Sequence, residues 1–428
     1  MMEKDVKLQK KEDKHYLTGK EIRAIAKANH KQMKELEKAK NKNVREEDFT
    51  SEMKDPNNIL EIEDLHSYFF TDQGVVKAVN GVTFSIPLNS TIGVVGESGC
   101  GKSVTAMSVM RLLQAPFGQI VSGSIRFKAN DFKKDENGKF IPVYVRDENG
   151  DIVQEEVVDK KGNKTLVNKV LKDEKGFPQY EREERVYDIA KMPIKEMYRL
   201  RGRQLSMVFQ EPMTSLNPVF TIGNQLDEVS LLHIPGCTKA LAKSRSLEML
   251  DMVGIAMPER VYNAFPHELS GGMRQRVMIA MALAAEPRLI IADEPTTALD
   301  VTIQAQILDL FNQLKAKING SILLITHDLG VIAEMADYVV VMYAGRIVEQ
   351  GTAEEIFLNP KHPYTIGLQK SKPAVNKHVN RLYSIPGSVP NPVNMPNYCY
   401  FRDRCNMRTK VCDGDYPNLI DLSSSNKV

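Results

Sequence analysis

A glycine-rich segment between an apolar strand and a helix constrains this chain more than any other feature. Residues 91–95 (Thr-Ile-Gly-Val-Val) have the pattern of a buried strand, and residues 104–113 continue as a helix. Between them, residues 96–103 fit the phosphate-binding pattern G-x-x-x-x-G-K-[ST]. Glycines let backbone N–H groups turn toward phosphates, and the helix N-terminus adds the positive end of its dipole. The order strand, loop, helix predicts an α/β core that binds a nucleotide.

All eight residues of this glycine-rich loop (residues 96–103) are candidate contacts to ATP. Lys102 is expected to reach the β- and γ-phosphates, and the Ser103 hydroxyl to bind Mg²⁺. The other six candidates contribute mainly backbone groups: Gly96, Glu97, Ser98, Gly99, Cys100 and Gly101.

Two carboxylates follow a second apolar strand pattern. Residues 288–292 (Arg-Leu-Ile-Ile-Ala) lead directly into Asp293 and Glu294. A buried strand would deliver Asp293 to its carboxyl end, where it can hold Mg²⁺ through water. Glu294 would then polarise the attacking water as a general base. The sequence therefore predicts ATP hydrolysis.

Residues 269–275 (Leu-Ser-Gly-Gly-Met-Arg-Gln) resemble the signature of ABC ATPases. Ser270, Gly271 and Gly272 would open a helix whose N-terminus forms a second anion site. The resemblance implies that this site, with Gln275, closes over the γ-phosphate bound by a partner subunit. It also implies four further site residues: Gln210 contacting Mg²⁺ and water, Asp300 at the dimer interface, His327 orienting the γ-phosphate, and Phe69 stacking on adenine, with Tyr68 as the alternative.

The resemblance narrows to the D-type ATPase of oligopeptide and dipeptide importers. It rests on residues 273–282, 292–300 and 343–349, then on His-Pro-Tyr-Thr (362–365) and Ile-Pro-Gly (385–387). It implies two transmembrane permease subunits, a second homologous ATPase subunit and an extracytoplasmic peptide-binding protein as partners, and no nucleic acid. Alternatives are an importer ATPase for another solute such as nickel, or a soluble ABC ATPase acting on nucleic acid or ribosomes. Intact Glu294 and His327 argue against a regulatory module that never turns over.

Membrane association is expected to come from partners. No apolar run approaches the ~18–20 residues that span a bilayer, and the N-terminus lacks the apolar core of a signal peptide. We expect a peripheral protein on the cytoplasmic face of the cell membrane.

The expected fold is α/β: an ABC ATPase core with an antiparallel β subdomain and a helical subdomain. Predicted parts are a basic helical extension (1–55), the ATPase domain (56–370) interrupted by a β-rich insertion (128–190), and a C-terminal tail (371–428). No internal repeat is evident. Asn80-Gly81 predicts a hairpin turn. In the insertion, strands are expected at 140–145, 152–158 and 165–171, a floppy loop being the alternative.

The N-terminal extension carries fourteen Lys or Arg and seven Asp or Glu in residues 1–45. Thr18 and Glu21 form a capping-box pattern, and apolar residues at helical spacing follow, so a helix near 18–40 is expected: Ile22, Ile25, Met33 and Leu36. Its charge suits an anionic membrane surface. The alternative is a helix that packs on the protein itself or stays disordered.

Three of the five cysteines fall in the tail: Cys399, Cys405 and Cys412. In a reducing cytoplasm such a cluster favours a metal site over disulfides. The family resemblance implies a [4Fe-4S] cluster, with Zn²⁺ as the alternative. No fourth cysteine follows Cys412, so ligation of a cluster by the tail needs another residue to substitute for the missing thiolate.

Overall fold

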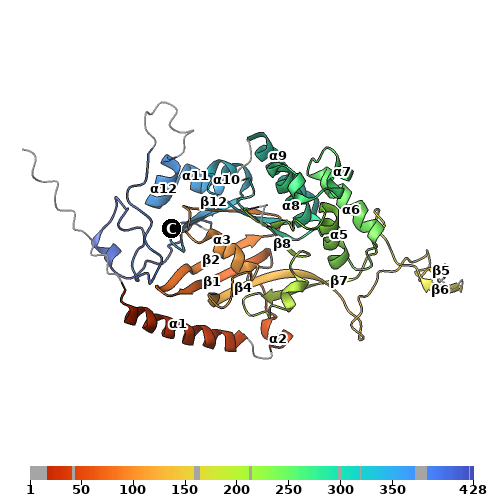
Figure 1. The fold of residues 1–428 in the computed structure, drawn as a ribbon, viewed down its shortest axis with the longest axis horizontal. Coiled ribbons are helices and arrows are strands. Elements are labelled where there is room, and N and C mark those ends of the chain that lie inside the picture. The colour runs from red at the N-terminus through yellow and green to blue at the C-terminus, as the bar shows by residue number, and fades with distance from the viewer. Residues whose placement is uncertain are drawn as a thin grey trace, which may run out of the picture.

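The computed structural model describes residues 17–40, 44–158, 164–211, 215–296, 301–318, 320–371, 383–423 and 425–428. Its framework is two sheets (Figure 1). The antiparallel sheet has the order β2-β1-β4-β7, from β1 (Asn58–Thr71), β2 (Gly74–Pro87), β4 (Gly118–Phe132) and β7 (Arg182–Asp188). The second sheet has the order β12-β11-β3-β10-β9-β8, from β3 (Thr91–Val95), β8 (Leu205–Val208), β9 (Leu289–Asp293), β10 (Ser321–Ile325), β11 (Tyr338–Tyr343) and β12 (Arg346–Thr352). All its neighbours are parallel except β12, which is antiparallel to β11.

The helices fall into three groups. The N-terminal part contributes α1 (Gly19–Lys40), α2 (Glu46–Phe49) and α3 (Lys102–Val109). A helical subdomain follows β8 and contains α5 (Ile222–His233), α6 (Lys239–Met252), α7 (Pro258–Asn263) and α8 (Gly271–Leu283). The C-terminal part contributes α9 (Val301–Ile318), α10 (Leu329–Met335), α11 (Ala353–Leu358) and α12 (Pro363–Lys370). Short 3₁₀ turns lie at Glu196–Arg199, Pro266–Glu268 and Lys410–Asp413. The expected fold class is confirmed.

The six-stranded sheet is buried on both faces because alternate side chains enter different cores. In β10, Leu323 and Ile325 pack with the antiparallel sheet and α3, whereas Ile322 and Leu324 pack with the helical subdomain, α9 and α10. The core on the side of the helical subdomain also includes three residues of the C-terminal tail: Met395, Tyr400 and Phe401. The tail is therefore part of the ATPase core.

The expected hairpin turn at Asn80-Gly81 is wrong. Both residues lie inside the continuous strand β2, and the turn to β1 lies between Thr71 and Gly74. β2 has one extra residue at Gly81 relative to β1. Leu65 of β1 pairs with Val82, and the next residue, His66, pairs with Asn80, so Gly81 has no partner in β1. Gly81 has φ of +83°, the conformation of a glycine in a β-bulge.

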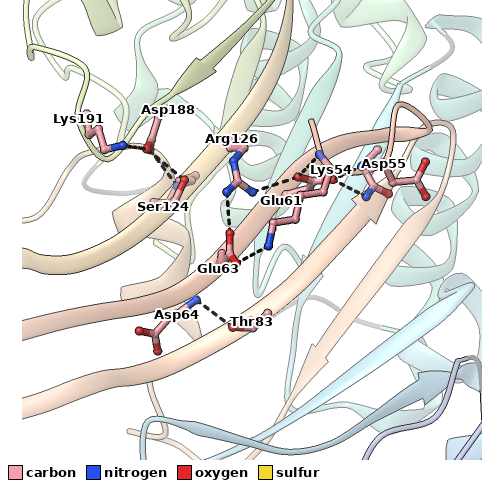
Figure 2. Close-up of polar contacts among 12 residues, drawn as sticks. Lys54, Asp55, Glu61, Glu63, Asp64, Thr83, Ser124, Arg126, Asp188 and Lys191 are labelled. Atoms are coloured by element: carbon pink, nitrogen blue, oxygen red, sulfur yellow. Dashed lines mark hydrogen bonds and ion pairs between the residues drawn. The ribbon is translucent and has the colours of Figure 1, made fainter. Parts of the chain in front are cut away.

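A polar network ties the antiparallel sheet together (Figure 2). Arg126 on β4 reaches Glu61 at 3.3 Å and Glu63 at 2.6 Å on β1, and Lys54 also pairs with Glu63. Glu61 is 4% exposed and accepts further hydrogen bonds from the backbone of Lys54 and Asp55. These bonds keep a buried carboxylate paired on the sheet that carries the candidate adenine contact.

Only part of the expected insertion leaves the sheet. β4 and β7 pair from 126 to 132 and from 182 to 188, so only the segment between Phe132 and Arg182, described at 133–158 and 164–181, projects beyond the sheet, on the side of α6 (Figure 1). Two of the three expected strands are present, as the exposed hairpin of β5 (Gln154–Val158) and β6 (Lys164–Asn168). Residues 140–145 form only isolated bridges, at Phe140, Pro142 and Tyr144.

The projecting ribbon contains a short repeat that sequence inspection missed. Asp135, Asp147 and Asp173 each accept, through Oδ1, the N–H groups two and four residues later at 2.8–3.0 Å. The glycine three residues after each Asp has positive φ. Between these turns the backbone closes rings of three hydrogen bonds, through Lys133, Ile141 and Glu181; Val143, Leu171 and Gln179; and Val145, Val153 and Lys169. The described part of the insertion is thus an ordered ribbon, not a floppy loop.

The expected N-terminal helix is present as α1, with the capping box between Thr18 and Glu21 formed. It packs on the protein itself. Asn29 is buried and donates to the Thr71 carbonyl at 2.8 Å, which holds α1 beside the β1–β2 hairpin (Figure 1). Of the four predicted apolar residues, Ile22 is exposed and the other three are half-buried. Within the residues described, no helix is both long and apolar enough to cross a bilayer.

Candidate functional site

The glycine-rich loop connects β3 to α3 and needs its glycines for steric reasons. Gly96 and Gly101 have φ of +152° and +99°. A Cβ at Gly96 would lie 2.2 Å from the Met342 carbonyl oxygen, and one at Gly101 would lie 2.2 Å from the Ala78 carbonyl oxygen. Gly99 also has positive φ, but a Cβ there would meet nothing within 4 Å. The loop therefore packs closely against β11 at Gly96 and against β2 at Gly101, while Ser98 and Gly99 are exposed to solvent.

Lys102 lies across the inside of this loop. Its Nζ donates to the carbonyls of Gly96 at 2.8 Å and Glu97 at 3.1 Å, and the residue is 6% exposed. Cys100 is buried behind it, and burial raises the pKa of its thiol. A single ammonium enclosed by a loop with inward backbone groups can bind a phosphate.

Ser103 and Asp293 meet although they come from different strand–loop units. Ser103 Oγ donates to Asp293 Oδ1 at 3.0 Å. Burial raises the pKa of the Asp293 carboxyl, and the hydrogen bond from Ser103 opposes that rise. A hydroxyl and a carboxylate are hard oxygen ligands, so this donor set fits Mg²⁺.

Glu294 is the centre of a second polar group. It follows β9 in a left-handed conformation with φ of +49°, and its N–H donates to the Ile325 carbonyl at the end of β10. Gln210 Nε2, after β8, donates to Glu294 Oε2 at 3.1 Å, and His327 Nδ1, after β10, lies 3.2 Å from Oε1. All three side chains leave the carboxyl ends of neighbouring strands, where ligands bind in α/β sheets. A carboxylate so placed can accept a proton from water.

The candidate signature opens α8 as predicted. Ser270 is its N-cap, and its hydroxyl accepts from the Met273 N–H at 3.3 Å. Gly271 is exposed and Gly272 half-buried, so this helix end is accessible. Gln275 is instead 2% exposed and donates to the Pro295 carbonyl at 2.6 Å, which joins α8 to the segment after β9. Asp300 lies outside the described residues.

Phe69 and Tyr68 have different surroundings. The Phe69 ring lies against Gly118, where a Cβ would approach it to 2.7 Å. The Tyr68 hydroxyl donates to Asn80 Oδ1 at 2.8 Å and lies 3.0 Å from His66 Nδ1. The phenol of Tyr68 is thus committed to its own sheet, which favours Phe69 as the ring that can stack on a base.

The expected [4Fe-4S] or zinc site is not supported. Among the described residues, which include Cys399, Cys405 and Cys412, no group of three or more potential ligands is placed to hold a metal ion. Two of these thiols accept local backbone hydrogen bonds instead, Cys405 from Met407 N and Cys412 from Thr409 N.

One contact at the loop was not foreseen. Arg404 of the tail pairs with Glu97 through both carboxylate oxygens, across 307 positions of sequence. The Glu97 N–H also donates to the Tyr364 hydroxyl at 2.7 Å. No local pattern could have revealed these contacts, although Arg404 lies beside Cys405 in a segment already singled out.

Comparison with known families agrees with this geometry. The family "ABC transporter" matches residues 79–297, and "Oligopeptide/dipeptide transporter, C-terminal region" matches residues 348–412. Among solved structures, a dimeric ATP-binding cassette, MJ0796 bound to ADP and Pi, aligns with a TM-score of 0.50 at 20% identity. The alignment covers 69% of this chain and 98% of that one, which shows the fold.

Curated relatives are closer in sequence. The oligopeptide transport ATP-binding protein AppD of Bacillus subtilis is 42% identical over 370 residues, covering 86% of this chain and 95% of the relative. The dipeptide transport ATP-binding protein DppD of the same organism is 42% identical, with 86% and 93% covered. The oligopeptide transport ATP-binding protein OppD of Haemophilus influenzae is 43% identical, with 83% and 92% covered. The chain therefore belongs to the ABC transporter ATPase family, in the group that carries the oligopeptide/dipeptide transporter C-terminal region.

Proposed function

We propose that this chain hydrolyses ATP to power the import of oligopeptides or dipeptides through a membrane permease. The observation that carries the proposal is the meeting of three elements at one sheet edge. The glycine-rich loop, the Ser103–Asp293 pair and the Gln210–Glu294–His327 group all lie at the carboxyl ends of the parallel strands. Their chemistry matches three requirements of phosphoryl transfer: binding of the phosphates, neutralisation of their charge and activation of the attacking water.

Each group has a separate task in this proposal. The loop amides and Lys102 bind the β- and γ-phosphates, and the Phe69 ring stacks on adenine. Ser103 and Asp293 would hold Mg²⁺, with Gln210 as a further contact, and the ion would supply charge neutralisation at the phosphates. Glu294 accepts a proton from the attacking water, while Gln210 and His327 orient its carboxylate.

A second ATPase subunit completes the site. The exposed N-terminus of α8, with Ser270, Gly271 and Gly272, closes over the γ-phosphate held by the partner. Gln275 acts indirectly, by fixing α8 to the Pro295 segment. ATP binding then clamps a heterodimer under two permease subunits, at the cytoplasmic face of the membrane, and an extracytoplasmic protein delivers the peptide.

The match of residues 348–412 and the names of the relatives support peptides as the cargo over nickel. The test is affinity purification of the tagged chain from detergent-solubilised membranes. We expect two integral membrane proteins and a second ATPase in equal amounts. Recovery of ribosomes or nucleic acid without any integral membrane protein would overturn the proposal.

A further inference from the structure

The glycine-rich loop carries one acidic residue, Glu97, and the C-terminal tail neutralises it. Arg404 Nη1 donates to Glu97 Oε2 at 2.6 Å, and Nη2 donates to Oε1 at 3.0 Å. This is the bidentate geometry of the stronger arginine–carboxylate pairs. The hydrogen bonds that Arg404 donates to Glu97 raise the pKa of Arg404 above its ordinary value.

Arg404 is itself fixed by the tail. Its Nε donates to the Pro386 carbonyl at 3.0 Å, and Nη1 lies 3.4 Å from the Tyr343 hydroxyl. The side chain is 5% exposed, whereas the Glu97 side chain remains 29% exposed. The guanidinium is therefore held rigidly, and the loop carboxylate is positioned against it.

An unpaired carboxylate at this place would oppose nucleotide binding. The phosphates of ATP are negative, and like charges repel most strongly where water is partly excluded. We infer that Arg404 is a positioning residue for ATP: it cancels the charge of Glu97 and holds the loop open to phosphates. The affinity of the loop for nucleotide is then set partly by the C-terminal tail. This inference rests on the proposed role of the loop as the ATP site.

A charge cycle tests the inference in the assembled transporter. The variants are Arg404→Gln, Glu97→Gln and the double variant, each measured for the Kd of ATP and for the KM and kcat of hydrolysis. Arg404→Gln is expected to raise Kd and KM about tenfold with little change in kcat, the size expected for one charged hydrogen-bonded pair. Glu97→Gln is expected to lower Kd about threefold, because Arg404 then adds a positive charge. The Kd of the double variant for ATP should lie within about threefold of that of the parent protein.

Arg408→Ala is the matched control, since Arg408 is an exposed tail arginine that pairs with Asp403 and Asp413 and not with the loop. It should leave Kd unchanged. If Arg404→Gln fails to fold, Arg404→Lys replaces it, with a smaller increase in Kd that Glu97→Gln again removes.

A double variant that binds ATP as weakly as Arg404→Gln alone would overturn the inference, because a packing defect is not corrected by removing Glu97. An unchanged Kd for Arg404→Gln would overturn it as well. Lys102→Ala separates this inference from the proposed function: tight ATP binding by that variant would contradict the loop as the ATP site, whatever the charge cycle shows.

Discussion

His327 Nδ1 lies 3.2 Å from Glu294 Oε1, which places a side chain from the end of β10 against one from the end of β9. Gln210 contacts the other carboxylate oxygen of Glu294. The carboxylate is thus held from two sides while its own residue occupies a left-handed conformation. Such strain persists only where the surrounding structure enforces it.

Glu294→Gln removes the proposed base and keeps the shape of the side chain. We expect ATP binding to remain within about threefold of the parent protein while turnover falls at least ~100-fold, the usual contribution of a general base. Steady-state hydrolysis and nucleotide binding by the assembled complex measure the two effects. Glu354→Gln, on α11, is the control. Near-normal hydrolysis by Glu294→Gln would contradict the role of Glu294.

Asp293→Asn tests the proposed Mg²⁺ contact. The amide keeps a hydrogen-bond acceptor for Ser103 but loses the charge that attracts a divalent cation. We expect at least a ~10-fold rise in the Mg²⁺ concentration that gives half-maximal hydrolysis. The measurement is a Mg²⁺ titration at saturating ATP, and an unchanged midpoint would count against this ligand.

Two glycines of the loop give a matched pair for its steric role. At both Gly101 and Gly99 an alanine would take a left-handed φ, a strain of about 1–2 kcal/mol. At Gly101 the Cβ would also meet the Ala78 carbonyl at 2.2 Å, which adds roughly 1–3 kcal/mol of overpacking. Urea unfolding should show a larger loss of stability for Gly101→Ala than for Gly99→Ala. Equal losses would mean that contact with β2 does not constrain the loop.

His362 gives the fold a pH dependence. Its Nδ1 accepts from the Tyr364 N–H at the start of α12, and burial lowers its pKa to about 4. Because the unfolded histidine titrates near 6.5, stability is full above that pH and falls as pH drops toward about 4. The loss should reach about 2 kcal/mol at pH 5 relative to pH 8.

His362→Asn keeps a capping oxygen and removes the titration. Urea unfolding of both proteins at pH 8 and pH 5 should show a smaller pH effect in the variant. An equal pH effect in the two proteins would rule out His362 as its source.

Local patterns predicted the parts of the site that short segments encode. Residues 96–103 and the pair Asp293–Glu294 follow single apolar strands, so the parallel sheet brings them together. The prediction of a hairpin turn at Asn80-Gly81 is wrong because a turn and a β-bulge both favour a glycine with positive φ. Only the pairing with β1 distinguishes the two.

Contacts between segments that are far apart in the sequence could not be predicted from local sequence patterns. The Arg404–Glu97 pair joins the tail to the loop, and the Asn29–Thr71 bond joins the arm to a hairpin. The metal hypothesis for the tail cysteines came from their spacing and the family resemblance, which do not fix where the thiols point. The repeated Asp-x-x-Gly turns were visible in the sequence, but their uneven spacing concealed them.

The most direct test of the proposed function is peptide uptake by proteoliposomes that contain the permease subunits, both ATPases and the binding protein. With the ATPases facing the inside of the proteoliposomes and ATP enclosed there, a labelled oligopeptide or dipeptide should accumulate inside and nickel should not. Glu294→Gln should abolish the accumulation. Hydrolysis that is unaffected by peptide, with no accumulation of peptide by the parent complex, would contradict the account.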